Sequence, residues 1–381
     1  MSQLLFQLGV TPELSIREIE RSFATTTTTV LPDVLVSLDD ASLPTPAEMM
    51  QILGGTIKIA TVITSIPKDS ETPLETAIAN HLCETSSGKV HFALAELGRN
   101  HLPALNPNEI KKIIQETGAT ARFVESSRTG LSAAVLIHQK KVREIMVIYA
   151  QDMHILAETV ATQDIDNWTI RDRSKPYADR KKGMLPPKLA RTMVNLCLGN
   201  TWSDDSVLLD PFCGSGTVLM EAMMRSVPVI GSDLDPDAVT GATANLTWLS
   251  KHYELSVPCN VISSDAANVK PGAVITHLVT EPFLGKPKPN LAQLPNMFKG
   301  LEKQYLGAFK HWRTFLADQA SLVVVFPQVI VEGKANTVFN LNALIDKLAT
   351  LGYTTHSDPT IYGRPQAIVQ RQLYQFTYTA K

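Results

Sequence analysis

The sequence predicts an α/β protein whose C-terminal half is a doubly wound parallel sheet and whose N-terminal half is an α+β region. The apolar runs at 207–209 and 227–230 are typical of strands buried on both faces of a parallel sheet, and a further strand is expected at 274–279. Helical spacing of apolar residues follows the first two runs. This alternation of strand and helix predicts βαβ units.

A glycine turn follows the first of these strands. The strand 207–209 ends at Asp210, and the turn Gly214-Ser215-Gly216 leads into a helix. The glycines let the backbone approach a ligand closely, and the start of the helix directs unpaired N–H groups toward it. Asp210 can accept hydrogen bonds from a cationic or hydroxyl-bearing ligand. Because no Lys follows the second glycine and no third glycine is in register, the turn is neither a P-loop nor a dinucleotide fingerprint.

A second acidic residue ends the next strand. The run 227–230 leads into Gly231-Ser232-Asp233, which places Asp233 where a carboxylate binds ribose hydroxyls in doubly wound sheets. The strand expected at 260–262 is followed by Asp265. Three strand ends of the predicted sheet therefore offer carboxylates to one ligand.

The glycine turn and Asp233 together resemble the S-adenosyl-L-methionine site of Rossmann-like amino-methyltransferases that act on nucleic acid. The resemblance implies that the acid at the third strand end bonds the adenine amino group, although an N-cap role is the alternative for that residue. A plain βαβ crossover without a ligand is the alternative for the whole segment. The expected cofactor-binding residues are Asp210, Pro211, Phe212, Cys213, Gly214, Ser215, Gly216, Thr217, Asp233 and Asp265.

The fourth strand end, Thr280-Glu281-Pro282-Phe283, is where the resemblance places the reaction. In the family this position usually has Asp or Asn, two prolines and an aromatic residue. The acid or amide and a backbone carbonyl accept hydrogen bonds from the target amine, so catalysis is mainly positioning and desolvation. Aligned on Gly285, the chain has Glu281 in place of Asp and Phe283 on the second proline. Aligned on the aromatic, Thr280 becomes the first residue and Glu281 replaces a proline.

We expect Glu281, Pro282 and Phe283 to present the target amine, with Phe283 stacking on a base. Glu is longer than Asp by one methylene, so the substrate geometry differs from the usual one. A strand-end turn in an inactive relative is the alternative.

The N-terminal half is expected to bind RNA. The segment Leu131–Ile137, between a helix-strand unit and a predicted strand pair, resembles the THUMP domain, an RNA-binding module. The segment Leu53–Ile59 resembles one that precedes the THUMP domain in archaeal and eukaryotic tRNA guanosine-10 N2-methyltransferases. The predicted organisation is a ferredoxin-like α+β domain at 1–105, a THUMP-like region at 106–165, a basic linker at 166–185 and a methyltransferase domain at 186–381.

The linker region is the most basic stretch of the chain. Residues 171–191 contain eight basic residues and two acids, although the whole chain has a net charge of −2. Lys and Arg contacts to phosphate provide most non-specific affinity for nucleic acid, so this stretch is a predicted RNA contact. A solvated linker without a partner is the alternative.

Composition favours a globular protein of the cytoplasm. Hydrophobic residues make up 44% and charged residues 19% of 381 residues, and no apolar run reaches the length of a membrane span. No secretory signal pattern opens the chain. The four cysteines have no metal-type spacing, so free thiols and no metal site are expected.

These observations predict a methyltransferase that uses S-adenosyl-L-methionine and acts on a guanine N2 amine of tRNA, without a membrane partner. Methylation of a ribosomal RNA or DNA base amine is one alternative. A non-catalytic RNA-binding relative that keeps the cofactor pocket is another. The sequence leaves open which nucleotide is methylated, whether one or two methyl groups are added, the oligomeric state and any protein activator.

Overall fold

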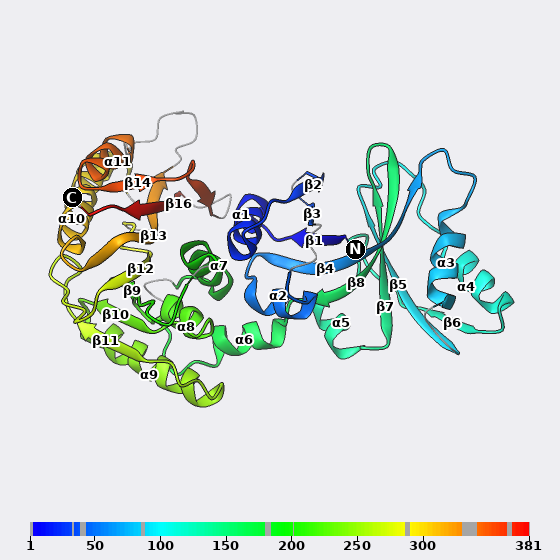
Figure 1. Cartoon of the computed structure of the whole chain (residues 1–381), viewed down its shortest axis with the longest axis horizontal. Helices are drawn as coiled ribbons and strands as arrows, with labels where there is room; N and C mark the ends of the chain where they lie inside the picture. The colour runs from blue at the N-terminus through cyan, green and yellow to red at the C-terminus, as the bar shows by residue number, and fades with distance from the viewer. Residues whose placement is uncertain are drawn as a thin grey trace. The chain divides into compact units, whose positions relative to one another are not determined.

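The computed structural model describes residues 3–32, 34–38, 43–84, 88–179, 184–200, 202–285, 290–329, 341–363 and 368–380. The chain forms two compact units (Figure 1). The first comprises residues 1–20 and 25–168, and the second comprises residues 21–24 and 169–381.

The first unit is built on an eight-stranded sheet in the order β2-β3-β1-β4-β8-β7-β5-β6. Strand β5 pairs in parallel with β6 and β7, and the other pairs are antiparallel. The strands are β1 (Leu4–Leu8), β2 (Thr28–Leu31), β3 (Leu35–Leu38), β4 (Thr56–Pro67), β5 (Lys89–Leu97), β6 (Thr120–Phe123), β7 (Val142–Tyr149) and β8 (Met153–Thr162).

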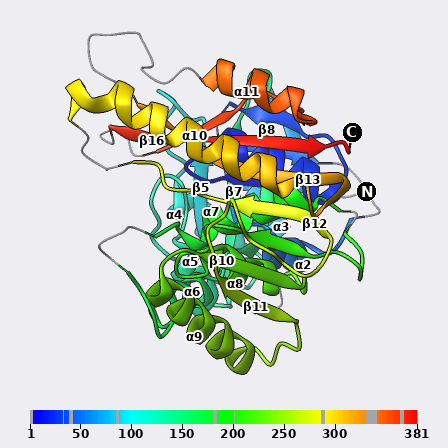
Figure 2. The same cartoon turned by 90° about the vertical axis from the view of Figure 1, so that its left-hand side faces the viewer.

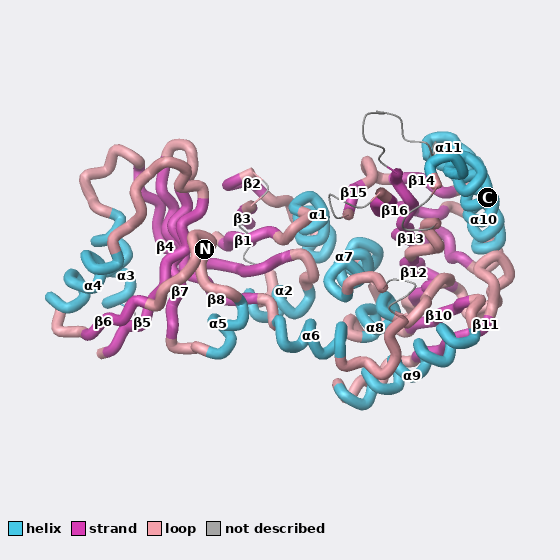
Figure 3. The backbone as a smooth tube through the Cα atoms, turned by 180° about the vertical axis from the view of Figure 1, so that it is seen from behind, coloured by secondary structure: helices cyan, strands magenta, loops and turns pink. Residues whose placement is uncertain are grey.

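Helices complete the first unit. They are α1 (Pro12–Phe23), α2 (Pro46–Ile52), α3 (Leu74–Glu84), α4 (Pro107–Glu116) and α5 (Ala133–His138). Figure 3 shows α3 and α4 side by side, and their apolar residues share a core with β5 and β7. Helices α1 and α4 each begin at a proline, whose missing N–H needs no partner at a helix start.

The segment Leu53–Ile59 is held by buried polar contacts within the first unit. Glu18 accepts hydrogen bonds from the backbone N–H groups of Gly54 (2.8 Å) and Gly55 (2.7 Å). Lys58 donates from Nζ to both carboxylate oxygens of Glu144, at 2.7 and 2.9 Å, with the two side chains 3% and 0% exposed. These contacts fix the position of the segment in the sheet of the first unit, and its resemblance to the segment before a THUMP domain stays a prediction. The predicted ferredoxin-like and THUMP-like bounds stay a prediction.

The second unit contains a doubly wound sheet, which confirms the predicted fold class. Its order is β11-β10-β9-β12-β13-β16-β14, with β15 paired to β16. Strands β9 to β13 are parallel to one another, whereas β16 is antiparallel to β13, β14 and β15. The strands are β9 (Leu208–Asp210), β10 (Val229–Asp233), β11 (Cys259–Ser263), β12 (Ile275–Thr280), β13 (Leu316–Val329), β14 (Tyr353–Thr355), β15 (Thr360–Tyr362) and β16 (Val369–Tyr378).

Helices cover both faces of this sheet (Figure 1). One face packs against α7 (Pro187–Leu198), α8 (Thr217–Met223) and α9 (Pro236–His252). The other packs against α10 (Leu294–Trp312) and α11 (Leu341–Thr350), and Figure 2 shows α10 running across the strands. The aromatic residues of α10 lie in this core.

The segment expected as a basic linker contains a further helix, α6 (Ile165–Arg173). Residues 180–183, in the middle of the basic stretch, lie outside the described residues, as do 286–289 and 364–367.

Candidate active site at the carboxyl ends of the strands

The carboxyl ends of the parallel strands bring the predicted site residues of the second unit together. Asp210 is the last residue of β9, Asp233 is the last of β10, and Thr280 is the last of β12. Because β9 lies between β10 and β12, these three residues end neighbouring strands. Open α/β sheets bind their ligands at this edge.

Asp210 is buried at the centre of this edge, with 2% of its surface exposed. Its Oδ1 accepts hydrogen bonds from Thr280 Oγ1 (2.7 Å) and from the backbone N–H of Phe212 (3.1 Å). Burial raises the pKa of the Asp210 carboxyl to about 7, and the negative charges of Asp233 and Glu281 act in the same direction. The bond from Thr280 links the predicted cofactor strand to the predicted reaction strand.

The glycine turn is joined to the next strand end. Asp233 accepts from the backbone N–H of Gly214 (2.9 Å) through Oδ2 and from that of Asp235 (3.0 Å) through Oδ1. Gly214 has φ +50°, and a Cβ placed there would meet no atom within 4 Å. Gly216 has φ +79°, and a Cβ there would lie 3.3 Å from Ala242 Cβ. The first glycine therefore keeps a side of the turn open, while the second permits close packing of helices.

Asn245 on α9 supports the glycine turn from beneath. It is fully buried, and its Nδ2 donates to the carbonyl oxygens of Ser215 (2.8 Å) and Tyr177 (3.0 Å). Its Oδ1 accepts from the backbone N–H of Tyr177 (2.8 Å). Gly241 leaves room for the Tyr177 ring, since a Cβ at this glycine would lie 2.1 Å from Tyr177 Cδ1. Asn245 is not among the site residues expected from the sequence. The one local indication of close packing here is Gly241, a glycine inside the helix.

Three basic residues of the stretch 171–191 are buried in the second unit. Glu221 on α8 pairs with Arg171 Nε (2.8 Å) and Arg191 Nη2 (2.7 Å), and all three side chains are at most 4% exposed. Lys175 is 6% exposed, and its Nζ donates to Thr217 Oγ1 (3.3 Å). These three cations attach the segment before the sheet of the second unit to α8. Because they are buried, these three side chains cannot contact RNA phosphates. The predicted RNA contact is therefore limited to the other basic residues of this stretch.

The remaining predicted cofactor residues lie along the same edge. Pro211 and Cys213 are buried, whereas Ser215 is half-buried and Phe212 packs against the core beneath α10. Asp265 is exposed, and its Oδ1 accepts from the backbone N–H of Ala267 (2.8 Å). That bond closes a turn and caps no helix, because β11 is followed directly by β12, and it leaves the carboxylate at the surface. Cofactor binding by these residues stays a prediction.

Glu281 is held by a residue that the sequence analysis missed. Arg371 on β16 donates from Nη2 to Glu281 Oε1 (3.0 Å) and from Nε to Oε2, which makes the pair bidentate. The Glu281 side chain is 19% exposed and that of Arg371 is 27% exposed. Because 90 residues separate the two in sequence, only the antiparallel strand β16 brings them together. No local motif marks Arg371.

The other two predicted reaction residues differ in exposure. Pro282 is buried, whereas Phe283 is 59% exposed. The carbonyl oxygen of Phe283 accepts a hydrogen bond from Tyr305 Oη (2.7 Å), and Tyr305 is 1% exposed in the core. Burial also raises the pKa of the Tyr305 hydroxyl, so it stays a donor. The backbone is therefore fixed while the Phe283 ring faces solvent beside Glu281.

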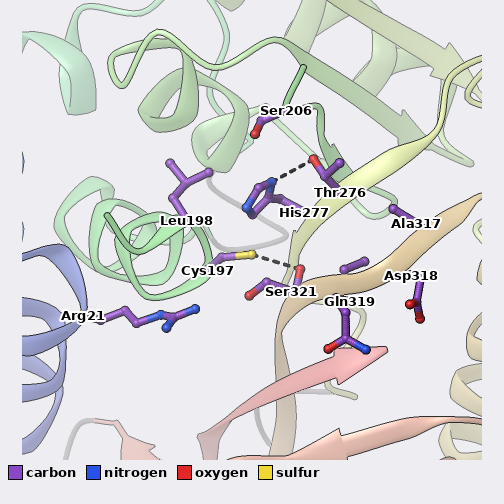
Figure 4. Close-up of a pocket in the computed structure, with 11 residues that line it drawn as sticks. Arg21, Cys197, Leu198, Ser206, Thr276, His277, Ala317, Asp318, Gln319 and Ser321 are labelled. Carbon is purple, nitrogen blue, oxygen red and sulfur yellow. Dashed lines mark hydrogen bonds between the residues drawn. The ribbon is translucent and has the colours of Figure 1, made fainter. Parts of the chain in front are cut away.

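A cavity of about 230 Å³ lies at the opposite ends of the strands (Figure 4). Its lining includes Thr276 and His277 at the start of β12 and Ser321 on β13. The Cys197 thiol donates to the Ser321 carbonyl oxygen (3.2 Å), and burial lowers the pKa of His277 to about 4. These groups are neutral and satisfied, and none of the predicted site residues lines this cavity.

Among the described residues, no cluster of three or more His, Cys, Asp or Glu side chains could hold a metal ion. No helix in the described part of the chain is long and apolar enough to cross a membrane.

Comparison with known protein families gives a match within the second unit. Residues 176–319 match the family model of the RMKL-like methyltransferase domain. This part of the chain is similar to that methyltransferase domain. The strand ends described above, from Asp210 to Glu281, all lie inside the matched methyltransferase domain.

Curated relatives match over part of the chain. A tRNA (guanine(10)-N2)-dimethyltransferase of Methanothermobacter thermautotrophicus is 34% identical over 142 residues, which are 37% of this chain and 39% of the relative. A tRNA (guanine(10)-N2)-dimethyltransferase of Methanocaldococcus jannaschii is 42% identical over 137 residues, 35% of either chain. The matches thus span less than two fifths of these relatives.

Solved structures share the fold of the whole chain. The crystal structure of TrmN from Thermus thermophilus has a TM-score of 0.57 at 14% identity, covering 99% of this chain and 100% of that one. The structure of SMU.472, a putative methyltransferase, in complex with SAH has a TM-score of 0.51 at 11% identity. The match covers 100% of this chain and 99% of that one. At such low identity these likenesses concern the fold alone.

Proposed function

We propose that this protein is an S-adenosyl-L-methionine-dependent methyltransferase that methylates a guanine N2 amine of tRNA. The family of residues 176–319 and the names of the curated relatives support the reaction and the substrate. The observation that supports it best is the bond from Thr280 Oγ1 to Asp210 (2.7 Å), which joins the glycine-turn strand to the strand that ends in Glu281 and Phe283. A ligand above the turn would therefore lie beside a carboxylate and an exposed ring.

The residues at the strand ends fit this cofactor. The open side of Gly214 admits a ligand close to the backbone, and Asp233 ends β10 where ribose hydroxyls are bound in such sheets. Asp265 is exposed at the next strand end and can accept from an adenine amino group. Asp210 supplies a buried carboxyl below the turn for the cationic part of the molecule. When bound, the cofactor supplies a methyl group on a positively charged sulfur, and its transfer to an amine nitrogen leaves S-adenosylhomocysteine and releases one proton.

The chain's own part in the reaction is to bind, orient and desolvate. Glu281 accepts hydrogen bonds from the target amine, which directs the nitrogen lone pair away from the carboxylate and toward the cofactor. The ring of Phe283 stacks on the base and displaces water from one of its faces. No strong general base is required, because the amine loses its proton only after the new bond has formed.

RNA binding by the N-terminal unit is the second part of the proposal. It rests on the THUMP-like order of Leu131–Ile137 and the strand pair that follows it. Exposed cations are available for phosphate contact at Lys140 and Lys141 in the first unit and at Arg173 on α6. The cytoplasm is the compartment in which we expect this reaction.

The test is transfer of label from S-adenosyl-L-methionine to unmodified tRNA by the wild type, Asp210→Ala and Glu281→Gln. Asp205→Asn is the matched control, because Asp205 is an exposed carboxylate before β9, at the other end of that strand. We expect label in tRNA with the wild type and the control. We expect a loss of at least ~100-fold in the two site variants, on the order of what a misplaced reacting group costs.

Other results would select the alternatives. Label in ribosomal RNA or DNA but not in tRNA would show that the substrate is that nucleic acid and not tRNA. Bound cofactor without transfer to any nucleic acid would make the protein a non-catalytic binder. Wild-type protein that binds no cofactor would contradict the proposal outright.

A further inference from the structure

The pair formed by Glu281 and Arg371 occupies one edge of the carboxylate at the reaction strand. Arg371 donates from Nη2 to Oε1 at 3.0 Å and from Nε to Oε2. A guanidinium that binds both oxygens in this way takes the two lone pairs that face the same side. Each oxygen keeps one lone pair, and these two point away from each other. Glu281 can therefore accept one N–H of a ligand at either oxygen, but not two adjacent ones.

Arg371 is itself held in the sheet. It lies in register with Pro327 of β13 on one side of β16 and with Tyr362 of β15 on the other. A planar guanidinium fork that is anchored in this way sets both the position and the plane of the carboxylate. Without the fork, the side chain of Glu281 would be free to take several staggered rotamers. The fork therefore fixes the direction of the remaining lone pairs before any ligand binds.

Strand β16 does not need this pair to stay in the sheet. It pairs with β13 along its whole length, Val369–Tyr378. The side chains of Glu281 and Arg371 are 19% and 27% exposed, so water reaches both members of the pair. A substitution of Arg371 should therefore act on the direction of the carboxylate and leave the backbone of β16 in place.

The carboxylate of Glu281 lies close to the predicted cofactor edge. Its negative charge is one of the causes that raise the pKa of Asp210, the last residue of β9. It also acts on the buried hydroxyl of Tyr305, which donates to the carbonyl oxygen of Phe283 (2.7 Å). Glu281 is thus near both the end of the glycine-turn strand and the backbone that carries the exposed ring.

We propose that Arg371 is a positioning residue of the methyl transfer, which holds Glu281 so that one outer lone pair accepts a single N–H of the target amine. The proposal rests on the proposed function and adds the residue that orients its acceptor. A carboxylate in another rotamer would displace this acceptor by ~1 Å or more, and such a displacement costs on the order of 10²-fold in rate. Arg371 touches Glu281 and not the substrate, so its loss should lower kcat and spare substrate binding.

The test measures kcat and KM separately for methyl transfer to unmodified tRNA by the wild type, Arg371→Ala and Arg371→Lys. We expect Arg371→Ala to lose roughly 10- to 100-fold in kcat, with KM for tRNA within about threefold of the wild type. Arg371→Lys keeps the charge without the planar fork and should lose about 3- to 10-fold, which tests the proposal even where Arg371→Ala does not fold. Calorimetric titration should give both variants the affinity of the wild type for S-adenosylhomocysteine.

Free guanidinium separates positioning from a structural role. Because the Arg371 side chain is 27% exposed, its removal leaves a space that a small solute can enter. Guanidinium at ~50 mM, far below the molar concentrations that unfold proteins, should raise kcat of Arg371→Ala by at least ~5-fold. Sodium chloride at the same concentration is the reference, because added ions weaken tRNA binding.

The matched variant is Gln375→Ala, four residues along β16 and on the same face as Arg371. Gln375 donates from Nε2 to the carbonyl oxygen of Leu196 on α7 (3.2 Å), so the substitution removes a side-chain bond of the same strand. We expect Gln375→Ala to keep kcat and to show no gain from guanidinium.

The outcomes are distinct. The kcat of the wild type in Arg371→Ala, or in Arg371→Lys where Arg371→Ala does not fold, would overturn the role of Arg371 while the proposed methyl transfer stands. A lower kcat that neither lysine nor free guanidinium improves would be a loss of structure and would also overturn it. A higher KM for tRNA at unchanged kcat would make Arg371 an RNA contact instead. Absence of transfer to any tRNA by the wild type would refute the proposed function and this inference with it.

Discussion

The buried carboxyl of Asp210 should make the stability of the second unit depend on pH. Its pKa is about 7 in the folded protein and 3.8 in an unperturbed aspartate. The folded state therefore binds the proton more tightly than the unfolded state, and stability falls as pH rises between these values. The contribution is fully present below pH 3.8 and is lost as pH rises through about 7.

The magnitude follows from the same two values. One pKa unit corresponds to about 1.4 kcal/mol, so the ionisation of Asp210 costs ~4 kcal/mol of unfolding free energy by pH 8. Roughly 2.5 kcal/mol of this loss falls between pH 5 and pH 8. Asp210→Asn removes the titration and keeps an oxygen that accepts from Thr280 Oγ1 and from the N–H of Phe212.

The assay is urea unfolding of the cofactor-free protein from pH 5 to pH 8, followed by tryptophan fluorescence. Trp312 is 1% exposed in the core of the second unit and reports its unfolding. We expect Asp210→Asn to gain stability relative to the wild type by roughly 2.5 kcal/mol over this range. Asp205→Asn, on an exposed carboxylate, should run parallel to the wild type. A constant difference between Asp210→Asn and the wild type at all pH values would refute the reasoning.

Other predictions concern the residues around the site. Glu221→Gln should lower the unfolding free energy by roughly 3–5 kcal/mol in a urea titration, because it removes the negative charge that pairs with two buried guanidinium groups. Gly216→Ala should cost ~1–3 kcal/mol in the same titration, from strain at positive φ. In calorimetric titrations Gly214→Ala should weaken S-adenosyl-L-methionine about tenfold, because its Cβ fills the open side of the turn; unchanged affinity would contradict the assigned site. Arg173→Ala should reduce the number of ions released on tRNA binding, measured from its salt dependence, by about one, with the unfolding free energy unchanged. Arg171→Ala should instead lower the unfolding free energy. Equal stability of the two arginine variants would contradict the buried position of Arg171.

Much of the second unit could be predicted because its signals are local. The apolar run before Asp210, the two glycines and the helix that follows lie within sixteen residues, 207–222, and they form β9, the turn and α8. The residue Asp235 caps α9 through a bond to the next-but-one backbone N–H (3.0 Å), which a short motif encodes completely. Parallel strands then bring the acids at their carboxyl ends to one edge.

The basic stretch shows where the local signal misleads. Charge in a sequence does not indicate exposure, and Arg171 and Arg191 are buried because Glu221 lies between them on α8. A cation in a protein interior requires such a partner, and the partner here is 50 residues away from Arg171. The sequence therefore predicted the charge of this segment correctly and its role only in part.

The sequence by itself determined the order of strands and helices, the glycine turn and the acids that end the strands, because each depends on neighbours within a few residues. The tertiary structure decided which of these groups touch. It brings Thr280 into hydrogen-bonding contact with Asp210, 70 residues away, and Arg371 into contact with Glu281, 90 residues away. Hydrogen bonds and ion pairs depend on distances of a few ångströms, and such distances between remote residues exist only once the sheet has formed.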